Sequence, residues 1–346
     1  MTVSLCVIAY NEENTIGKLI DDIKKQDYNH KKIEIVFVDN LSSDNTINIM
    51  NEFKSKDSSF KEIKICSCKT HMQASCWNEA IKNTVGDVII RVDAHASIPK
   101  NFVRMNVLTI LEGESVCGGG RPNRVEKNTP WQKTLLSAEE YMFGNFAEYR
   151  KKTKRKQYVD TLFHACYKRE VFKKVGGFNE SLGRTEDNEF HYRVRSNGYK
   201  ICLSDNITSY QNVRSSFVKM LNQKFSNGLW IGLTLGVCPQ CLSYLYFAPL
   251  LLVLAYLICF LLSILNFSIL LSILSVVYTV FIISITVSAF IKNKFYPHFL
   301  LLPIIFSFMH FSYGIGTLCG IIKMPFWRKN ISNQVLKNID DIKKIV

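Results

Sequence analysis

A long apolar stretch near the C-terminus constrains this chain more than any other feature. From Ser243 to Ile322 the sequence contains no Asp or Glu, and its only Lys or Arg residues are Lys292 and Lys294. Charged side chains are costly in the hydrocarbon core of a bilayer, so this composition is typical of membrane-spanning segments. A helix needs roughly 20 residues to cross. We expect a membrane region over residues 243–322, with crossings at about 244–265, 267–289 and 299–322.

The sequence leaves open on which side of the membrane the chain ends. Three crossings would place the tail, residues 323–346, on the side opposite to the N-terminal part. The tail is rich in Lys and Arg, however, and basic segments favour the cytoplasmic side. The third run contains Pro303 and three glycines, so a re-entrant segment is the alternative to the three crossings that we expect.

Residues 1–212 have ordinary charge, and in them short apolar runs alternate with amphipathic helical segments. Val3–Ala9, Ile33–Val38 and Val88–Val92 are almost continuously apolar, as expected for strands that are buried on both faces. Segments with apolar residues at helical spacing separate them. This alternation predicts an α/β domain with a mostly parallel sheet and helices on both faces. A further strand is predicted from Asp160 to Tyr167.

The segments between this domain and the apolar stretch are amphipathic or basic. Residues Trp131–Tyr149 have a helical pattern, and the basic run Arg150–Lys156 follows. A solvated loop is one interpretation of that run, and contact with anionic headgroups is the other. In residues 213–242, large apolar side chains are interleaved with Lys219 and Lys224. This pattern predicts a helix that lies on a bilayer surface.

The net charge and the cysteine content indicate which kinds of partner and which compartment suit this chain. The formal net charge is +14, which suits a membrane surface or a phosphorylated ligand. No zinc-finger spacing or RNA-binding signature supports nucleic acid. The 11 cysteines are odd in number and irregularly spaced, so we expect reduced thiols in a domain that faces the cytoplasm. The sequence thus predicts a multi-pass protein of the plasma membrane.

Acidic side chains follow three of the predicted strands. Glu12 comes after the first strand, Asp39 ends the second, and Asp93 ends the third with His95 two positions later. Carboxyl ends of parallel strands meet at one edge of a sheet, where ligands bind. Alternate residues of an extended segment point the same way, so Asp93 and His95 can converge on a divalent cation. A solvated turn is the alternative for this fragment taken alone.

Four motifs in this order resemble the family 2 glycosyltransferases, which are inverting enzymes with the GT-A fold. The motifs are Val7–Glu13, Val38–Thr46, Arg91–Ala96, and Gly177–Glu180 followed by Glu186-Asp187. Asn40 and His95 stand where the family commonly has a second Asp. Within the family, the Asp-Ala-His-Ala sequence, Val159-Asp160-Thr161 and the membrane-bound C-terminus are similar to the ExoA-type subgroup of succinoglycan synthesis. The resemblance covers about residues 1–230.

The resemblance implies roles for particular residues. Asp187 would be the general base and Glu186 its positioning neighbour, although acids at a helix start also suit capping and the helix dipole. Asp93 and His95 would hold Mg²⁺ or Mn²⁺, and a direct hydrogen bond from His95 to the diphosphate is the alternative for that residue. The nucleotide-sugar, with uracil as the expected base, would be bound by Ala9, Tyr10, Glu12, Asp39, Arg91 and Asp93.

The resemblance also implies a reaction. An inverting, metal-dependent hexosyltransferase would add one sugar to a polyprenyl-diphosphate-linked oligosaccharide in exopolysaccharide, capsule or other cell-surface glycan synthesis, alongside other polysaccharide-assembly enzymes. Processive synthases carry a Gln-x-x-Arg-Trp motif, but the comparable position here is Gln223-Lys-Phe-Ser-Asn227. The alternatives are a polyprenyl-phosphate sugar synthase, a processive synthase, and a membrane module that binds a sugar nucleotide without catalysis.

Overall fold

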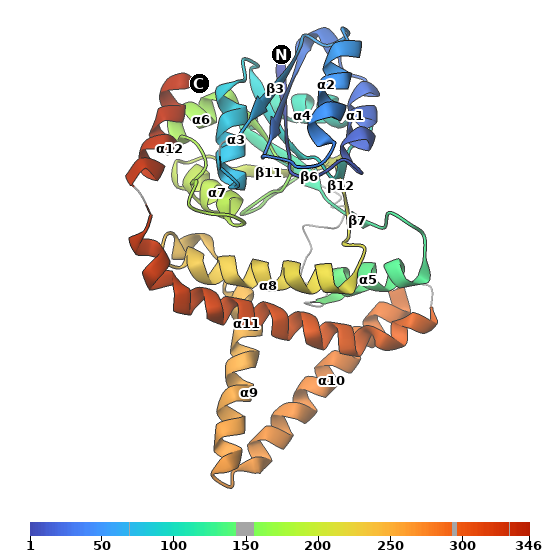
Figure 1. The fold of residues 1–346 in the computed structure, drawn as a ribbon, viewed down its shortest axis with the longest axis vertical. Coiled ribbons are helices and arrows are strands. Elements are labelled where there is room, and N and C mark those ends of the chain that lie inside the picture. The colour runs from blue at the N-terminus through green and yellow to red at the C-terminus, as the bar shows by residue number, and fades with distance from the viewer. Residues whose placement is uncertain (69, 143–155, 293–295, 332) are drawn as a thin grey trace. The chain divides into compact units, whose positions relative to one another are not determined.

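The computed structural model describes residues 1–68, 70–142, 156–292, 296–331 and 333–346 (Figure 1). These residues form two compact units. Unit 1 comprises Met1–Pro122, Tyr149–Gln211 and Ile331–Val346, and unit 2 comprises Asn123–Glu148 and Asn212–Asn330. Each unit is therefore assembled from segments that lie far apart in the sequence.

Within the described residues, unit 1 is built around an eight-stranded sheet of order β3-β2-β1-β4-β10-β6-β11-β9. The strands are β1 (Val3–Ala9), β2 (Ile33–Asp39), β3 (Glu62–Ser67), β4 (Val88–Asp93), β6 (Val116–Gly120), β9 (Gln157–Tyr158), β10 (Cys166–Lys168) and β11 (Ile201–Thr208). The first four are mutually parallel, and β10 is antiparallel to both β4 and β6. β6 therefore points the same way as β4, and β11 is parallel to β6. The predicted α/β class is confirmed.

Helices cover both faces of this sheet. One layer contains α1 (Ile16–Lys24), α2 (Thr46–Lys56) and α4 (Phe102–Leu111). The other contains α3 (Gln73–Lys82), α6 (Arg169–Val175), α7 (Glu186–Ser196) and α12 (Asn333–Ile345). Side chains along a strand alternate between faces, so Ile90 and Val92 of β4 pack in the first layer and Ile89 in the second. Arg91 and Asp93 share the face of Ile89.

Several sequence-based boundaries differ from the structure. The strand predicted from Asp160 begins at Cys166 instead, and Asp160 is an exposed side chain paired with Arg195 at 3.0 Å. The helix predicted as far as Tyr149 is α5 (Pro130–Tyr141), and its last residues from 143 lie outside the described part of the chain. So does the basic run, apart from Lys156, which pairs with Glu112. Cys6, Cys66, Cys68, Cys76, Cys117, Cys166, Cys202, Cys259 and Cys319 are free thiols.

Short elements complete the chain. β5 (Ala96–Ser97) pairs with β12 (Tyr210–Asn212) in antiparallel register. This pairing brings Gln211 beside the turn that follows β4. The remaining short elements in the described part of the chain are β7 (Asn123–Arg124) and the 3₁₀ turns His30–Lys32, Pro239–Cys241, Tyr244–Phe247 and Pro297–Leu301.

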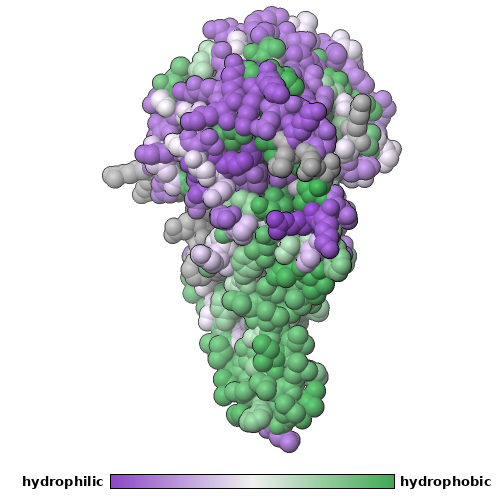
Figure 2. Space-filling model, turned by 90° about the vertical axis from the view of Figure 1, so that its left-hand side faces the viewer, coloured by the Kyte–Doolittle hydropathy of each residue, from purple (hydrophilic) through white to green (hydrophobic). Residues whose placement is uncertain are grey.

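Unit 2 is helical. Besides α5 it contains α8 (Phe217–Thr234), α9 (Ala248–Ile264), α10 (Ser268–Lys292) and α11 (Leu302–Lys329). α8 and α11 run side by side, whereas α9 and α10 form a hairpin that projects away from them (Figure 1). Judged by length and composition, three helices of the described residues are able to cross a membrane. They are Tyr244–Ile264, Ser268–Lys292 and Pro297–Lys329. Figure 2 shows the continuous hydrophobic surface on these apolar helices.

Glycines let α8 and α11 approach each other at backbone distance. A Cβ atom on Gly228 of α8 would lie 2.0 Å from the carbonyl oxygen of Tyr313, and one on Gly316 of α11 would lie 2.2 Å from that of Phe225. Any larger residue at either position would push the two helices apart.

Candidate active site

The carboxyl ends of β1 and β2 form one side of the candidate site. Asp39 ends β2 and is buried, and its Oδ2 accepts a hydrogen bond of 3.1 Å from the Ser42 N–H. Its other oxygen, Oδ1, is buried without a hydrogen-bond partner. A buried acceptor in that state costs free energy unless a ligand supplies the donor. Asp39 therefore has one oxygen available to an N–H group of a bound molecule.

Backbone strain is concentrated at the same strand ends. Asn11, after β1, has φ of 53°, and Leu41, after β2, has φ of 60°. Leu in the left-handed region is rare, and strain of this kind clusters at ligand sites. The Asn11 side chain stabilises both turns, because its Oδ1 accepts a hydrogen bond of 2.8 Å from the Ser43 N–H. Beside them Tyr10 is half exposed, next to the ring of His71. Ala9 is buried as the last residue of β1.

The structure brings Glu12 and His95 together. Glu12 Oε1 lies 3.0 Å from His95 Nδ1, although 83 positions separate the two residues. The other ring nitrogen, His95 Nε2, lies 3.3 Å from Nε2 of Gln211. Because an amide nitrogen donates and a carboxylate oxygen accepts, His95 Nε2 accepts from Gln211 and His95 Nδ1–H donates to Glu12. The glutamate and glutamine side chains hold the histidine ring at the end of β4.

Asp93 is held by a histidine that the sequence did not suggest. His164 Nε2 lies 3.2 Å from Asp93 Oδ2, and His164 Nδ1 lies 2.8 Å from the Ser209 hydroxyl. Burial lowers the pKa of His164, the Asp93 carboxylate opposes this effect, and the ring directs an N–H at Nε2 toward Asp93. Donation of that N–H to Asp93 leaves Nδ1 to accept from Ser209. This chain of contacts orients the carboxylate of Asp93.

Asp93 remains ionised in this setting. Burial alone would raise the pKa of its carboxyl group, but the hydrogen bond from His164 and the basic side chains of His164, His95 and Arg91 outweigh burial. The pKa of Asp93 is thereby held well below its usual range. A carboxylate and an imidazole suit a divalent ion such as Mn²⁺. In the described part of the chain no three His, Cys, Asp or Glu side chains converge as a ready-made metal site.

Arg91 is buried beneath the acidic start of α7 rather than exposed at the sheet edge. Its guanidinium lies 4.3 Å from the ring centre of Trp77 and 4.5 Å from that of Phe178. Its Nη2 lies 3.9 Å from Oε1 of Glu186. Glu186 itself is only 3% exposed. Arg91 therefore supplies the counter-charge for the acidic pair from inside the domain.

Glu186 and Asp187 differ in exposure although they are neighbours. Burial, and then the charge of Asp187, raise the pKa of Glu186 to about 8. Burial also raises the pKa of Asp187, and this outweighs the lowering by Arg91, the Asn188 N–H and Arg121. Asp187 is only half buried, so it can reach a ligand. A carboxylate with a raised pKa is a better proton acceptor than an ordinary one. The helix begins after Thr185, whose side chain makes no capping hydrogen bond.

Arg121 is a second basic residue of this edge that the sequence did not single out. It follows β6, is 8% exposed, and its guanidinium lies 3.5 Å from the ring centre of Phe163. The triple glycine before it has a packing reason, since a Cβ on Gly119 would lie 1.7 Å from the Ile207 carbonyl oxygen. Arg121 could have been recognised from its position at the carboxyl end of a strand, because Asp39 and Asp93 also lie at the carboxyl ends of their strands.

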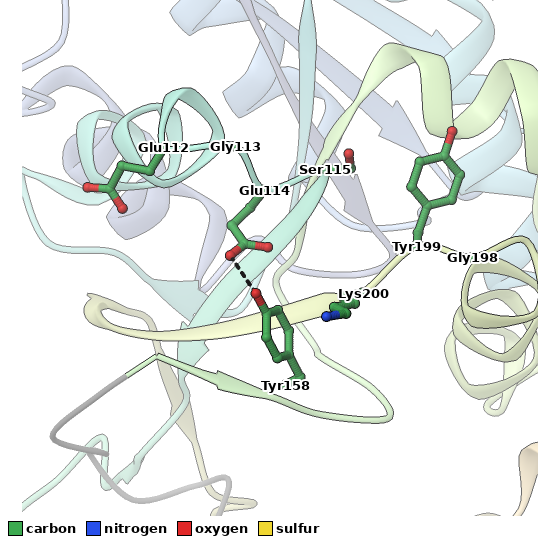
Figure 3. Close-up of a pocket in the computed structure, with 8 residues that line it drawn as sticks. All are labelled: Glu112, Gly113, Glu114, Ser115, Tyr158, Gly198, Tyr199 and Lys200. Atoms are coloured by element: carbon green, nitrogen blue, oxygen red, sulfur yellow. Dashed lines mark hydrogen bonds between the residues drawn. The ribbon is translucent and has the colours of Figure 1, made fainter.

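An open pocket of about 380 Å³ lies at the opposite edge of the sheet (Figure 3). It is lined by residues that precede β6 and β11, so it is at the amino ends of these strands. Within it the Tyr158 hydroxyl donates to Oε1 of Glu114 at 3.2 Å. None of the residues singled out above lines this pocket. The candidate site is therefore the carboxyl edge.

Known proteins share this sequence pattern and fold. Residues 4–176, half of the chain, match the family "Glycosyl transferase family 2". A dolichyl N-acetyl-α-D-glucosaminyl phosphate 3-β-D-2,3-diacetamido-2,3-dideoxy-β-D-glucuronosyltransferase of Methanococcus voltae is 27% identical over 93% of this chain and 97% of its own. Succinoglycan biosynthesis protein ExoA of Rhizobium meliloti (strain 1021) is 26% identical over 66% of this chain and 68% of its own.

A solved structure supports the fold. The mannosyltransferase PcManGT from Pyrobaculum calidifontis, in complex with GDP-Man and Mn²⁺, superposes with a TM-score of 0.57. The match covers 91% of this chain and 86% of that one, at 15% sequence identity. At this identity the likeness shows the fold alone, and it agrees with the mixed, mostly parallel sheet described above.

Proposed function

Because the chain belongs to glycosyl transferase family 2, we propose that it moves one sugar, with inversion, from a UDP-sugar to a lipid-linked acceptor in cell-surface glycan synthesis. The observation that carries the proposal is the convergence of Asp39, Asp93, His95 and Asp187 at one edge of the sheet. These side chains match the three tasks of the reaction. These are binding the nucleotide, neutralising the diphosphate, and removing a proton from the acceptor.

Asp39 would select the nucleobase. The free Oδ1 of Asp39 requires an N–H donor, and uracil presents a ring N–H with carbonyl groups on both sides. The half-exposed Tyr10 ring next to it offers an aromatic surface for the base. Glu12, held against His95, would lie toward the sugar and phosphate part of the donor. A purine ring N–H could also reach Asp39, so a comparison of UDP- and GDP-sugars tests this assignment.

Asp93 and His95 would hold the divalent ion together with the diphosphate. When bound, such an ion neutralises the negative charge that develops on the leaving nucleotide. The chain contributes a carboxylate that is kept ionised and is oriented by His164. His95 would exchange its contact with Gln211 for the ion or for a phosphate oxygen. The structural relative with GDP-Man and Mn²⁺ supports a metal requirement of this kind.

Asp187 would accept the proton of the acceptor hydroxyl. Its half-exposed carboxylate lies at the start of α7, and its raised pKa suits a general base. Attack of that hydroxyl on the anomeric carbon, with departure of the nucleoside diphosphate, is a single displacement that inverts the centre. Glu186, buried against Arg91, keeps the start of the helix in place. Its pKa of about 8 means that it is mostly protonated at pH 7.

A lipid-linked sugar is the acceptor that the comparisons favour over bare polyprenyl phosphate. The Methanococcus relative, which matches along almost its whole length, is named for transfer to dolichyl N-acetylglucosaminyl phosphate. The three long apolar helices would bring the chain to such a lipid in a plasma membrane, with unit 1 in the cytoplasm. The position where processive synthases have Gln-x-x-Arg-Trp departs from that motif, which favours addition of a single sugar.

The experiment is a transfer assay with the purified full chain in lipid nanodiscs. UDP- and GDP-sugars are offered with polyprenyl-linked monosaccharides or with bare polyprenyl phosphate, in the presence of Mn²⁺, Mg²⁺ or EDTA. We expect transfer from a UDP-sugar to a lipid-linked sugar, loss of transfer in EDTA, and an inverted anomeric centre in the product.

The matched pair of variants is Asp187→Asn and Asp21→Asn, since Asp21 is exposed on α1. Removal of a general base reduces transfer by about 10²–10⁴-fold, whereas Asp21→Asn leaves the rate unchanged. Full transfer by a folded Asp187→Asn variant would refute the assignment of the base. Undiminished transfer in EDTA would refute the metal role of Asp93 and His95.

A further inference from the structure

We infer that the chain crosses the membrane twice, through α9 and α10, and that α11 lies with α8 in the surface of the leaflet that faces unit 1. This replaces the third crossing expected from the sequence. The inference concerns how the chain contacts the bilayer, and it does not depend on the proposed reaction.

The C-terminal helix α12 is part of unit 1. Ile342 is fully buried in the layer that contains Trp77, and Asn338 Nδ2 donates to Glu180 Oε2 at 2.9 Å. The carbonyl oxygen of Ile339 accepts a hydrogen bond of 3.0 Å from the Gly177 N–H. These contacts hold the end of the chain on the globular unit, hence on the same side of the membrane as that unit.

The connection between α11 and α12 is too short to cross a bilayer. α11 ends at Lys329 and α12 begins at Asn333. A fully extended chain spans at most ~3.6 Å per residue, so this connection reaches roughly 14 Å. The hydrocarbon core is about 30 Å thick. The C-terminal end of α11 therefore lies on the side of unit 1.

The beginning of α11 lies on that side as well if only α9 and α10 cross. The two helices are joined by a tight turn, in which Asn266 has φ of 70°, and large apolar side chains are exposed along both of them. A hairpin of two crossings returns the chain to its starting side. α11 then begins and ends on one side, which a single crossing cannot do.

A fourth crossing by α8 would also return the chain, but α8 is not suited to it. Its 18 residues include Lys219, Lys224 and three amide side chains, and it is not among the helices of the described residues that are apolar enough to cross. Lys224 pairs with Glu139 of α5 at 2.7 Å and is 5% exposed. Ionised side chains of this kind are expensive at the centre of a bilayer.

The apolar residues of α11 are buried inside the protein to a greater extent than those of α9 and α10. Half of its apolar window is buried inside the protein, against 11% for α9 and 17% for α10. Its large exposed apolar side chains fall on one narrow stripe, because they are spaced by four or seven residues. The stripe consists of Ile304, Phe308, Ile315, Ile322 and Phe326. One face covered by α8 and a single apolar stripe on the other match a helix in the plane of the leaflet.

The distribution of charge agrees with two crossings. Lys292 and the basic tail from Lys323 then lie on the side of unit 1, and the far side receives only the uncharged turn around Asn266. Trp230 of α8 and Trp327 of α11 contact each other at 6.1 Å between ring centres. Tryptophan is enriched at the headgroup level of membranes, where this pair of helices would lie.

The test places a short epitope tag at one of four positions in the full chain, which are after Cys241, at Asn266, between residues 292 and 296, and after Val346. Antibody access is compared in right-side-out and inside-out vesicles. We expect only the tag at Asn266 to be reached from the side opposite to unit 1. A tag after Val346 on that far side would establish three crossings, and tags on the far side both after Cys241 and between 292 and 296 would establish four. Either result overturns the inference.

A pair of lysine substitutions tests the placement of α11 without any insertion. Ile315 and Val280 are exposed apolar residues near the middle of α11 and α10. Ile315→Lys should leave the amount of membrane-inserted protein unchanged, because lysine at the surface reaches the headgroups. Val280→Lys should reduce it several-fold, since a lysine at the bilayer centre is expensive. An equal reduction by both substitutions would contradict an interfacial α11.

Discussion

Replacement of Glu186 by glutamine should stabilise the protein at alkaline pH and have little effect at acidic pH. Burial raises the pKa of this side chain from 4.5 to about 8, so the folded chain holds a proton that the unfolded chain releases. Between these two pH values the wild type therefore loses stability as pH rises. Glutamine has the shape of the protonated side chain and does not titrate. The difference between the two proteins thus grows with pH.

The size of the effect follows from the pKa shift. One pKa unit corresponds to about 1.36 kcal/mol, so a shift from 4.5 to about 8 is worth at most about 5 kcal/mol above pH 8. The charge of Arg91 beside the carboxyl group is already included in this value. For a chain of 346 residues, with an unfolding entropy of about 2.1 cal/mol/K per residue, 1 kcal/mol changes Tm by roughly 1–2 °C. We expect the two melting curves to coincide near pH 5 and to separate by several degrees at pH 8.5.

The assay is intrinsic-fluorescence melting of the detergent-solubilised full chain at pH 5, 7 and 8.5. Glu170→Gln is the control, because it makes the same substitution at an exposed side chain. The same difference in Tm between Glu186→Gln and wild type at all three pH values would refute the raised pKa of Glu186. Transfer activity gives a second readout, because Glu186→Gln retains the neutral group present at pH 7 and should keep most of the activity that Asp187→Asn loses.

Three further outcomes follow from particular contacts. Gly316→Ala should lower Tm by several degrees, because the added Cβ would lie 2.2 Å from the Phe225 carbonyl oxygen. Gly17→Ala is the control, since its Cβ would have nothing within 4 Å, and it should raise stability by about 0.5–1 kcal/mol. Equal changes of Tm in the two variants would argue against the close packing of α8 and α11. His164→Ala should weaken binding of Mn²⁺ in the presence of UDP by about 10–100-fold in calorimetric titrations. His30→Ala, at a half-buried histidine stacked on Phe60, should not, and an unchanged affinity in His164→Ala would mean that His164 does not orient Asp93. Asp39→Asn should weaken UDP binding by about 1–3 kcal/mol, and undiminished affinity would remove Asp39 from the base site.

Several features of this protein follow from local patterns in its sequence. Apolar runs separated by amphipathic segments determine strands and helices, because the period of burial differs between the two. Acids placed after β1, β2 and β4 share an edge, because parallel strands all end on the same side. The long apolar helices of unit 2 follow from composition, because a long stretch of the sequence contains almost no charged residue. For these reasons the fold class and the edge that carries the candidate site were predictable.

Other features depended on contacts between residues far apart in the chain. His164 reaches Asp93 across 71 positions, Arg91 is buried between Trp77 and Phe178, and α12 returns to the first unit through Ile339 and Ile342. No periodicity encodes such pairings, because they arise when whole elements pack. The apolar composition of α11 likewise suits either a lipid or a protein environment, and only its packing on α8 distinguishes the two. Local sequence patterns therefore predict the class of fold and the edge of the sheet that carries the candidate site. Tertiary packing decides which side chains lie beside Asp93 and Glu186, because residues so distant in the chain meet only in the folded state.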